Sequence, residues 1–257
     1  MSQTRSAPAL YLIGGTGEAN QAAARLQAEG YSVTVSVATP WGAVLSAEAG
    51  SHLADTGPKD ACRMARRASE LGAAAIVDCS HPYALAASDQ ARLAARQAGL
   101  PYLRYSRPAS PIPKADVIRA ASFSEALEIL KDRPGRALLT VGTRHLEPFV
   151  REHIDFTARI LPVPESLAEC ERLGMDPRDI IAAHPPFSVE FNRACIRHSR
   201  AGILLTKDSG LEGGLMEKAD AAAAEGIELL VVDRPAEPGA IHDLEILVRS
   251  LTKLLAK

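Results

Sequence analysis

The sequence predicts an α/β fold in two domains, each built on a parallel sheet. Along most of the 257 residues, apolar runs of strand length alternate with segments that have apolar residues at helical spacing. The stretch RPASPIPKAD at 107–116 has three prolines in ten residues and interrupts this alternation. A glycine-rich turn follows the first apolar run. We therefore expect one domain over 1–107 and a second over 108–257.

The first predicted domain opens with a strand that ends at Ile13 and a helix with apolar residues at Ala19, Ala22, Ala23 and Leu26. Valines alternate with polar residues in the segment 31–39, as in a second strand. The remaining elements are a helix over 60–72, an apolar strand over 73–79, a helix over 85–99 and a strand from 101. Alternating strands and helices of this kind form a doubly wound parallel sheet.

The alternation resumes in the second predicted domain. We expect helices over 122–132, 165–173, 189–199 and 216–226, and strands over 136–142, 157–162, 179–184, 202–208 and 227–235. A last helix, 241–257, has an apolar stripe that could pack on either domain.

The turn GGTGE at 14–18 links the first strand to the first helix. Its glycines allow a sharp turn without a Cβ, and the N–H groups and dipole of the following helix attract a phosphate. The match to the G-x-G-x-x-G fingerprint is partial, because Asn20 stands where the third small residue belongs. A turn that serves geometry alone is the alternative. The predicted cofactor-binding residues here are Gly14, Gly15, Thr16, Gly17 and Glu18.

Four further stretches follow predicted strands, where open α/β sheets bind ligands. In SHPY at 80–83, His81 could donate a proton or clamp a ligand, whereas Ser80 and Pro82 also suit a plain helix start. We list Ser80, His81, Pro82 and Tyr83 as cofactor-binding candidates.

The other three stretches lie in the second domain. Arg144 suits a carboxylate or phosphate, Phe187 an apolar ring, and Lys207 a substrate anion. A solvated arginine, a structural turn and an exposed Lys–Asp pair are the respective alternatives. The candidate substrate-binding residues from these stretches are Gly142, Thr143, Arg144, His184, Phe187, Ser188, Thr206, Lys207, Asp208 and Ser209.

Composition limits the classes of partner. The formal net charge of -2 gives no support to nucleic-acid binding, and no apolar run approaches the ~20 residues of a membrane span. The N-terminal segment lacks an apolar signal core, so we expect a cytoplasmic protein. The four cysteines form no C-x-x-C pair, and we predict no metal site.

Taken in order, these motifs resemble the precorrin-6A reductase family of cobalamin biosynthesis, including its cobalt-precorrin branch. The resemblance rests on GGTGEA, DCSHPYA, PYLRYSRP, GTR, PFS and TKDSG, at 14–19, 78–84, 101–108, 142–144, 186–188 and 206–210. It implies two Rossmann-like domains with the active site in the cleft between them. It also implies hydride transfer from a nicotinamide cofactor to a ring double bond of a tetrapyrrole, which converts precorrin-6A, or its cobalt form, to the 6B form.

The resemblance also suggests how the ligands are held. The macrocycle has many carboxylate side chains, which suits Arg107, Arg144 and Lys207. After the second strand, neither the acid that favours NAD nor the arginine that favours NADP is present. Ser36 and Thr39 could therefore serve either cofactor; we name NADPH first, with NADH as the alternative.

We take His81, Lys207 and Asp208 as candidate catalytic residues, with water as another possible proton source. A dinucleotide-sensing regulatory protein is the competing hypothesis, and an NAD(P)-dependent reductase of another substrate is a third. The polar residues after strands of the second domain favour an enzyme. The sequence makes no prediction of oligomeric state.

Overall fold

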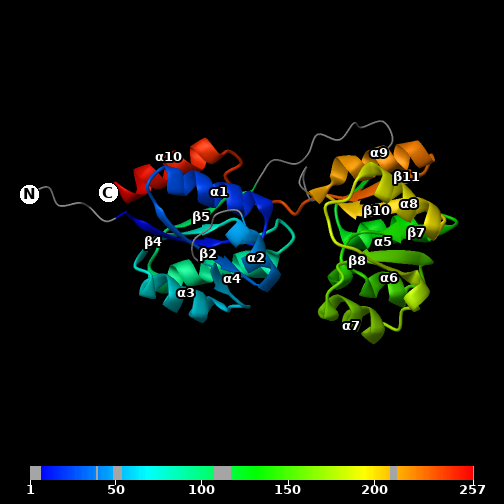
Figure 1. The fold of residues 1–257 in the computed structure, drawn as a ribbon, viewed down its shortest axis with the longest axis horizontal. Coiled ribbons are helices and arrows are strands. Elements are labelled where there is room, and N and C mark those ends of the chain that lie inside the picture. The colour runs from blue at the N-terminus through cyan, green and yellow to red at the C-terminus, as the bar shows by residue number, and fades with distance from the viewer. Residues whose placement is uncertain (1–6, 39, 49–53, 107–116, 209–212, 257) are drawn as a thin grey trace, which may run out of the picture. The chain divides into compact units, whose positions relative to one another are not determined.

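The computed structural model describes residues 7–38, 40–48, 54–106, 117–208 and 213–256, which form two compact units (Figure 1). Unit 1 comprises Met1–Pro108 and Ala236–Lys257, and unit 2 comprises Ala109–Pro235. Each unit has its own parallel sheet and its own core, and each is described separately. Among these residues, no helix combines the length and the apolar character of a membrane span.

Unit 1 has a five-stranded sheet in the order β3-β2-β1-β4-β5. Its neighbouring strands pair in parallel. The strands are β1 (Ala9–Ile13), β2 (Ser32–Val37), β3 (Ala54–Thr56), β4 (Ala73–Asp78) and β5 (Tyr102–Arg104). The helices are α1 (Gly17–Ala28), α2 (Pro40–Glu48), α3 (Ala61–Glu70), α4 (Leu85–Ala98) and α10 (Leu244–Leu255).

Strand β1 is buried on both faces because helices cover both sides of the sheet. Leu10 and Leu12 join a core with α1 and α10, whereas Tyr11 and Ile13 join a second core with α3 and α4. Figure 1 shows α1 and α10 on one side of this sheet and α3 on the other. This arrangement is the doubly wound sheet that the sequence predicts.

Two elements of unit 1 were not predicted. The expected series runs from the second strand to α3, but the chain first forms α2 and the short edge strand β3. Helix α2 contains Gly42 within nine residues, and β3 has three residues, so neither gives a clear periodic signal.

The C-terminal segment clusters with unit 1, which is one of the two placements that the sequence left open for the last helix. Leu247, Val248 and Leu251 of α10 are buried in the core that contains Leu10 and Leu12. The segment before α10 is fixed as well, since the Ile241 N–H donates to the Arg104 carbonyl at 2.8 Å. The apolar stripe of α10 thus completes the cover over one face of the first sheet.

Unit 2 has a six-stranded sheet in the order β6-β11-β10-β7-β8-β9, again with parallel pairing. Its strands are β6 (Val117–Ala120), β7 (Arg136–Leu139), β8 (Phe156–Ile160), β9 (Ile180–Ala182), β10 (Ala201–Lys207) and β11 (Glu228–Val232). Its helices are α5 (Phe123–Lys131), α6 (Glu147–Arg151), α7 (Pro164–Arg172), α8 (Val189–Ser199) and α9 (Leu215–Glu225). The short elements β6 and α6 were not predicted.

Helices α8 and α9 cover one face of the second sheet. Leu138 of β7 and Leu204 of β10 pack there with Ile196 of α8 and with Leu215 and Ala222 of α9. Figure 1 shows α6 and α7 on the opposite side of the same sheet. Both units therefore have helices on both faces of a parallel sheet, as the sequence predicts.

Candidate active site

In each sheet, the strand order reverses at one place. In unit 1 the chain moves outward from β1 to β2 and β3 and then returns to β4 on the other side of β1. In unit 2 it moves from β7 to β8 and β9 and then returns to β10 beside β7. Ligands of open α/β proteins bind at such switch points, outside the carboxyl ends of the strands.

Four of the five predicted stretches lie at these two switch points, whereas residues 184–188 follow the edge strand β9. Residues 14–18 follow β1 and residues 80–83 follow β4, its neighbour. Residues 142–144 follow β7, and Lys207 and Asp208 stand at the end of β10, again its neighbour. The fold thus brings the predicted residues together in pairs of loops within each unit.

The glycine turn has a conformation that other residues do not readily adopt. A Cβ on Gly14 would lie 2.6 Å from Cγ1 of Val35, and Gly15 has a φ of +104°. Thr16 caps α1 by accepting the Ala19 N–H at 3.1 Å. Its hydroxyl also donates to the Cys79 carbonyl at 3.3 Å and so joins the two loops of the switch point.

This turn fits the pyrophosphate of a dinucleotide. Gly17 is the first residue of the 12-residue helix α1, and Glu18 is in its first turn. The helix therefore directs N–H groups and a positive dipole end to the carboxyl edge of the sheet. Asn20, which departs from the fingerprint, accepts a hydrogen bond from Ser46 of α2 at 3.2 Å.

Asp78 shapes the loop after β4. Its carboxylate is fully buried and accepts the Ser80 N–H at 2.9 Å, the Arg104 guanidinium at 3.1 Å and the Tyr102 hydroxyl at 2.7 Å. Arg104 also donates to Glu237 at 2.8 Å. Burial and the charge of Asp78 raise the pKa of Tyr102, so its hydroxyl keeps its proton and the loop keeps its anchor.

His81 has a defined orientation in this loop. Its Nδ1 accepts the Tyr83 N–H at 3.3 Å, and the two rings are 5.6 Å apart. A neutral ring with Nδ1 as acceptor has its proton on Nε2. Pro82 between them is buried.

The simpler interpretation of this loop, in which Ser80 caps the following helix, is wrong. The helix begins at Leu85, with Ala84 at the N-cap position and no side-chain cap. Ser80 Oγ instead lies 3.2 Å from Ser88 Oγ and accepts a hydrogen bond from Arg104 at 3.4 Å. The turn at 82–84 moves the helix start away from Ser80.

Ser36 is buried in β2, and its carbonyl accepts the Gly14 N–H at 2.8 Å. Its side chain lies with Asp55 at the hydroxyl of Tyr11. The predicted residues Thr39, Arg107 and Ser209 lie outside the described residues.

At the switch point of unit 2, the chain forms a second glycine turn. Gly142 has a φ of +83° and precedes a 3-10 turn, Thr143–His145, in which Arg144 is exposed. Burial and the positive charge of Arg144 lower the pKa of Lys207 to about 8. Arg144 and Lys207 are therefore close enough to interact electrostatically, as expected for residues at the ends of neighbouring strands.

His145 was not among the predicted residues. It stacks on Phe123 at 3.9 Å, and burial, with the charges of Lys207 and Arg144, lowers its pKa to about 4. The ring is consequently neutral near pH 7. Because the sequence motif GTRH points first to the arginine, the histidine gave no separate signal.

Asp208 is buried and held by two arginines. Its Oδ1 lies 3.3 Å from Nε of Arg234, and its Oδ2 lies 3.6 Å from Nη2 of Arg119. Nε of Arg234 also donates to the Asp208 carbonyl at 2.9 Å. These contacts fix the end of β10 beside Lys207; a catalytic role of Asp208 stays a prediction.

The loop after β9 has protein contacts of its own. His184 is exposed, and Ser188 caps α8 by accepting the Phe191 N–H at 3.1 Å. The Phe187 ring stacks on Phe191 at 5.0 Å and lies 4.1 Å from the guanidinium carbon of Arg159. Phe187 thus supports a buried arginine.

Arg159 of β8 and Lys218 of α9 were missed by sequence reasoning. Both are buried, with 6% of each residue exposed. They lie inside a predicted strand and a predicted helix, whereas the predicted site loops follow strands. A charged residue within the otherwise apolar strand ARI was the available signal.

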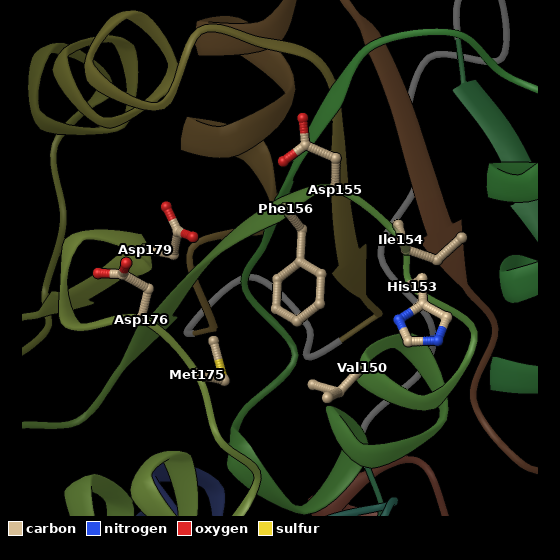
Figure 2. A pocket seen from close by; sticks show the side chains of 8 residues that line it. All are labelled: Val150, His153, Ile154, Asp155, Phe156, Met175, Asp176 and Asp179. Atoms are coloured by element: carbon tan, nitrogen blue, oxygen red, sulfur yellow. The ribbon is translucent and has the colours of Figure 1, made fainter.

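The structure also has a pocket at the opposite end of the second sheet (Figure 2). It is lined by residues that precede β8 and β9 or begin β8: Val150, His153, Ile154, Asp155, Phe156, Met175, Asp176 and Asp179. These are the amino ends of the strands, away from the switch point. Within the described ranges, no group of three His, Cys, Asp or Glu residues could hold a metal ion.

Two Rossmann-like sheets, each with predicted site residues at a switch point, define an α/β protein of the doubly wound class. Comparison with known families makes this specific. The model of the family described as "Precorrin-6x reductase CbiJ/CobK" matches residues 9–252, and the chain belongs to this family. It is a reductase of the precorrin-6A reductase family of cobalamin biosynthesis, which favours the enzyme over the regulatory hypothesis.

Curated relatives and a solved structure agree. A cobalt-precorrin-6A reductase of Priestia megaterium is 31% identical over 241 residues, covering 91% of this chain and 93% of its own. A precorrin-6A reductase of Rhodococcus erythropolis is 32% identical over 248 residues, covering 92% and 93%. The structure titled "CobK precorrin-6A reductase" has a TM-score of 0.75 at 23% identity, covers 96% of this chain and 97% of its own, and supports the fold.

Proposed function

We propose that this reductase transfers a hydride from NADPH to a ring double bond of precorrin-6A, or of its cobalt form, and so produces the 6B form. The observation that supports this most directly is the pair of switch points. One has a glycine turn suited to a pyrophosphate, and the other has cations suited to a polycarboxylate. A family match over 9–252 supplies the substrate class.

Unit 1 would hold the nucleotide. The backbone at Gly14, Gly15 and Gly17 would face the pyrophosphate, and the loop with His81 and Tyr83, fixed by Asp78, would lie beside the rest of the cofactor. The bound nicotinamide supplies the hydride; the protein supplies orientation and a defined electrostatic environment.

Unit 2 would hold the macrocycle. Arg144 and Lys207 would bind its carboxylates, while Asp208, anchored by Arg119 and Arg234, keeps Lys207 in place. Reduction of a double bond also needs a proton. Lys207, whose pKa of about 8 lets it exist in both forms near neutral pH, is the proposed donor, and His81 Nε2 is the alternative that the assay below tests.

The test is turnover by the purified full-length chain. We expect NADPH to be oxidised in equal amount to the macrocycle reduced, and macrocycle absorption to change because its conjugated path shortens. Parallel assays with NADH, and with the cobalt-free and cobalt substrates, define the cofactor and the branch of the pathway.

Variants define the proton donor in the same assay. Replacing the true donor should lower kcat by roughly a hundredfold, and replacing the other residue should change mainly KM. Tight dinucleotide binding without turnover of either tetrapyrrole would contradict the proposed function.

A further inference from the structure

Unit 2 buries two cations that form no ion pair among the described residues. Arg159 and Lys218 are each 6% exposed, and neither forms an ion pair with an acid in the described part of the chain. Arg159 donates to Asn192 Oδ1 at 2.7 Å, and Lys218 Nζ donates to the Gly213 carbonyl at 2.7 Å. Both partners are neutral. Burial of a charge without a countercharge is costly, so a fold seldom keeps it without a use.

Strand register places these cations on one face of the sheet. Leu138 pairs with Leu204 of β10 and with Thr157 of β8, and two residues further along lie Thr206 and Arg159. This row is under α8 and α9, because Leu138 and Leu204 pack against those helices. Lys218 is in the first turns of α9, which follows β10 and covers the same face.

Thr206 adds an unused hydrogen-bonding group. It is fully buried at the end of β10, and its Oγ1 has no hydrogen-bond partner among the described residues. Such a group is normally satisfied in a folded protein. A bound oxygen ligand would satisfy it.

The electrostatics of the region are positive. Burial and the charges of Arg159 and Lys207 lower the pKa of Lys218 to about 7. Glu217 on α9 opposes this effect, but it is the last of the four causes in size. From α8, Asn192 and Cys195 face Arg159; the amide has no charge, and burial raises the pKa of the Cys195 thiol, which keeps it neutral near pH 7.

We propose that Arg159, Lys218 and Thr206 bind one carboxylate of the macrocycle, separate from the carboxylates that Arg144 and Lys207 bind. A planar guanidinium and an ammonium with a neighbouring hydroxyl match the oxygens of a carboxylate. The inference rests on the proposed function for the identity of the macrocycle. In the free protein Arg159 and Lys218 repel each other, and a bound carboxylate would offset this repulsion.

The main test compares Arg159→Gln and Lys218→Met with Arg178→Gln in the full-length chain. Arg178 precedes β9 and has an 88% exposed side chain, so its variant removes a positive charge elsewhere in unit 2. We expect the first two variants to raise the macrocycle KM about tenfold or more, equivalent to at least about 1.4 kcal/mol. The nicotinamide KM of these two variants should stay within about twofold of the wild-type value. The macrocycle KM of Arg178→Gln should also stay within about twofold of wild type.

Thermal denaturation separates ligand binding from a structural role. Lys218→Met removes a repelled cation, so the Tm of the free protein should equal or exceed that of wild type. Thr206→Val keeps the shape and removes the orphan hydroxyl, so it should weaken macrocycle binding without lowering Tm. A lower Tm with unchanged macrocycle affinity in these variants would overturn the proposal.

A binding measurement without the nicotinamide cofactor tests this site independently of the proposed function. Uroporphyrin, a macrocycle with carboxylates on its side chains, is titrated into each protein, and succinate and inorganic phosphate are tested as competitors. Weaker uroporphyrin binding by Arg159→Gln and Lys218→Met supports the site even if wild type reduces no precorrin. Binding equal to that of Arg178→Gln, or competition by phosphate but not by succinate, overturns the carboxylate assignment.

Discussion

At the scale of single residues, the glycine turn combines two requirements that the sequence could not separate. Gly14 is required by packing, because an added Cβ would lie 2.6 Å from Cγ1 of Val35. Gly14→Ala should therefore lower the free energy of unfolding by roughly 1–3 kcal/mol, measured by urea denaturation. Val35→Ala makes room for the new methyl group, so the double variant should recover part of the loss beyond additivity. An additive double variant would contradict the steric explanation.

Gly17 has a different role, since it is the first residue of α1 and is exposed. A side chain there would occupy the space that a pyrophosphate needs. Gly17→Val should raise the Kd of NADPH about tenfold or more, measured by titration, with little change in stability. Gly202→Val is the control, because nothing lies within 4 Å of its Cβ position. Equal NADPH affinity in both variants would remove the turn from the site.

The half-buried Lys207 and the buried Lys218 also give a pH dependence with a definite sign. Their pKa values in the free protein, about 8 for Lys207 and about 7 for Lys218, lie below the ordinary lysine value of 10.5. Anion binding favours their charged forms, so the macrocycle is bound with proton uptake, and its affinity should fall as pH rises above 7. Unfolding also takes up protons, so stability of the free protein should rise as pH increases towards 10.

Lys207→Arg isolates one contribution to this profile. Arginine keeps its charge throughout the range, so the fall in macrocycle affinity above pH 8 should become shallower in the variant. The measurement is macrocycle Kd against pH for both proteins. Profiles of equal slope would show that Lys207 does not bind the macrocycle as a cation.

At the scale of elements, α10 connects the end of the chain to the first core. Leu247 and Leu251 are fully buried, whereas Ile246 on the same helix is 47% exposed. Leu251→Ala should destabilise unit 1 by about 2–5 kcal/mol, and Ile246→Ala should cost less than about 1 kcal/mol. Hydrogen exchange provides the measurement: β1 should lose protection in Leu251→Ala, and β10 should not. Equal loss in both strands would contradict the assignment of α10 to unit 1.

Sequence patterns predict the long strands and helices of this fold better than its short elements. The main strands and helices of both sheets were predicted, because burial on two faces leaves continuous apolar runs and helices leave apolar stripes. Short elements such as β3 and β6 have three and four residues, too few for a period to emerge. The loops at the switch points were found because their position follows from topology alone.

Other features depend on contacts between distant parts of the chain. The packing of α10 could not be predicted, since its stripe suits any apolar face. Arg159 and Lys218 were missed because their burial depends on where α8 and α9 lie over the sheet. Helix α4 starts at Leu85 rather than near Ser80. The loop before it is fixed by the Asp78 carboxylate, which accepts hydrogen bonds from Arg104 and Tyr102, residues distant in the sequence.

At the scale of the whole molecule, two units with separate cores predict two separable responses to ligands. If unit 1 binds the nucleotide and unit 2 the macrocycle, each ligand should slow hydrogen exchange mainly in its own unit. NADPH should protect 14–19 and 78–84, and the macrocycle should protect 140–145 and 203–208. At about 100 times its Kd, a ligand stabilises the state that binds it by about 2.7 kcal/mol, which is large enough to measure.

Variants in each unit provide the matched controls for this experiment. Gly17→Val should weaken the protection by NADPH and keep the protection by the macrocycle, and Lys218→Met should do the reverse. Each variant is thus the control for the other, because both proteins are measured under the same conditions with both ligands. Protection by NADPH confined to unit 2, or loss of both responses in Gly17→Val, would contradict the assignment of one ligand to each sheet. The expected result would place the hydride donor with the glycine turn and the acceptor with the buried cations.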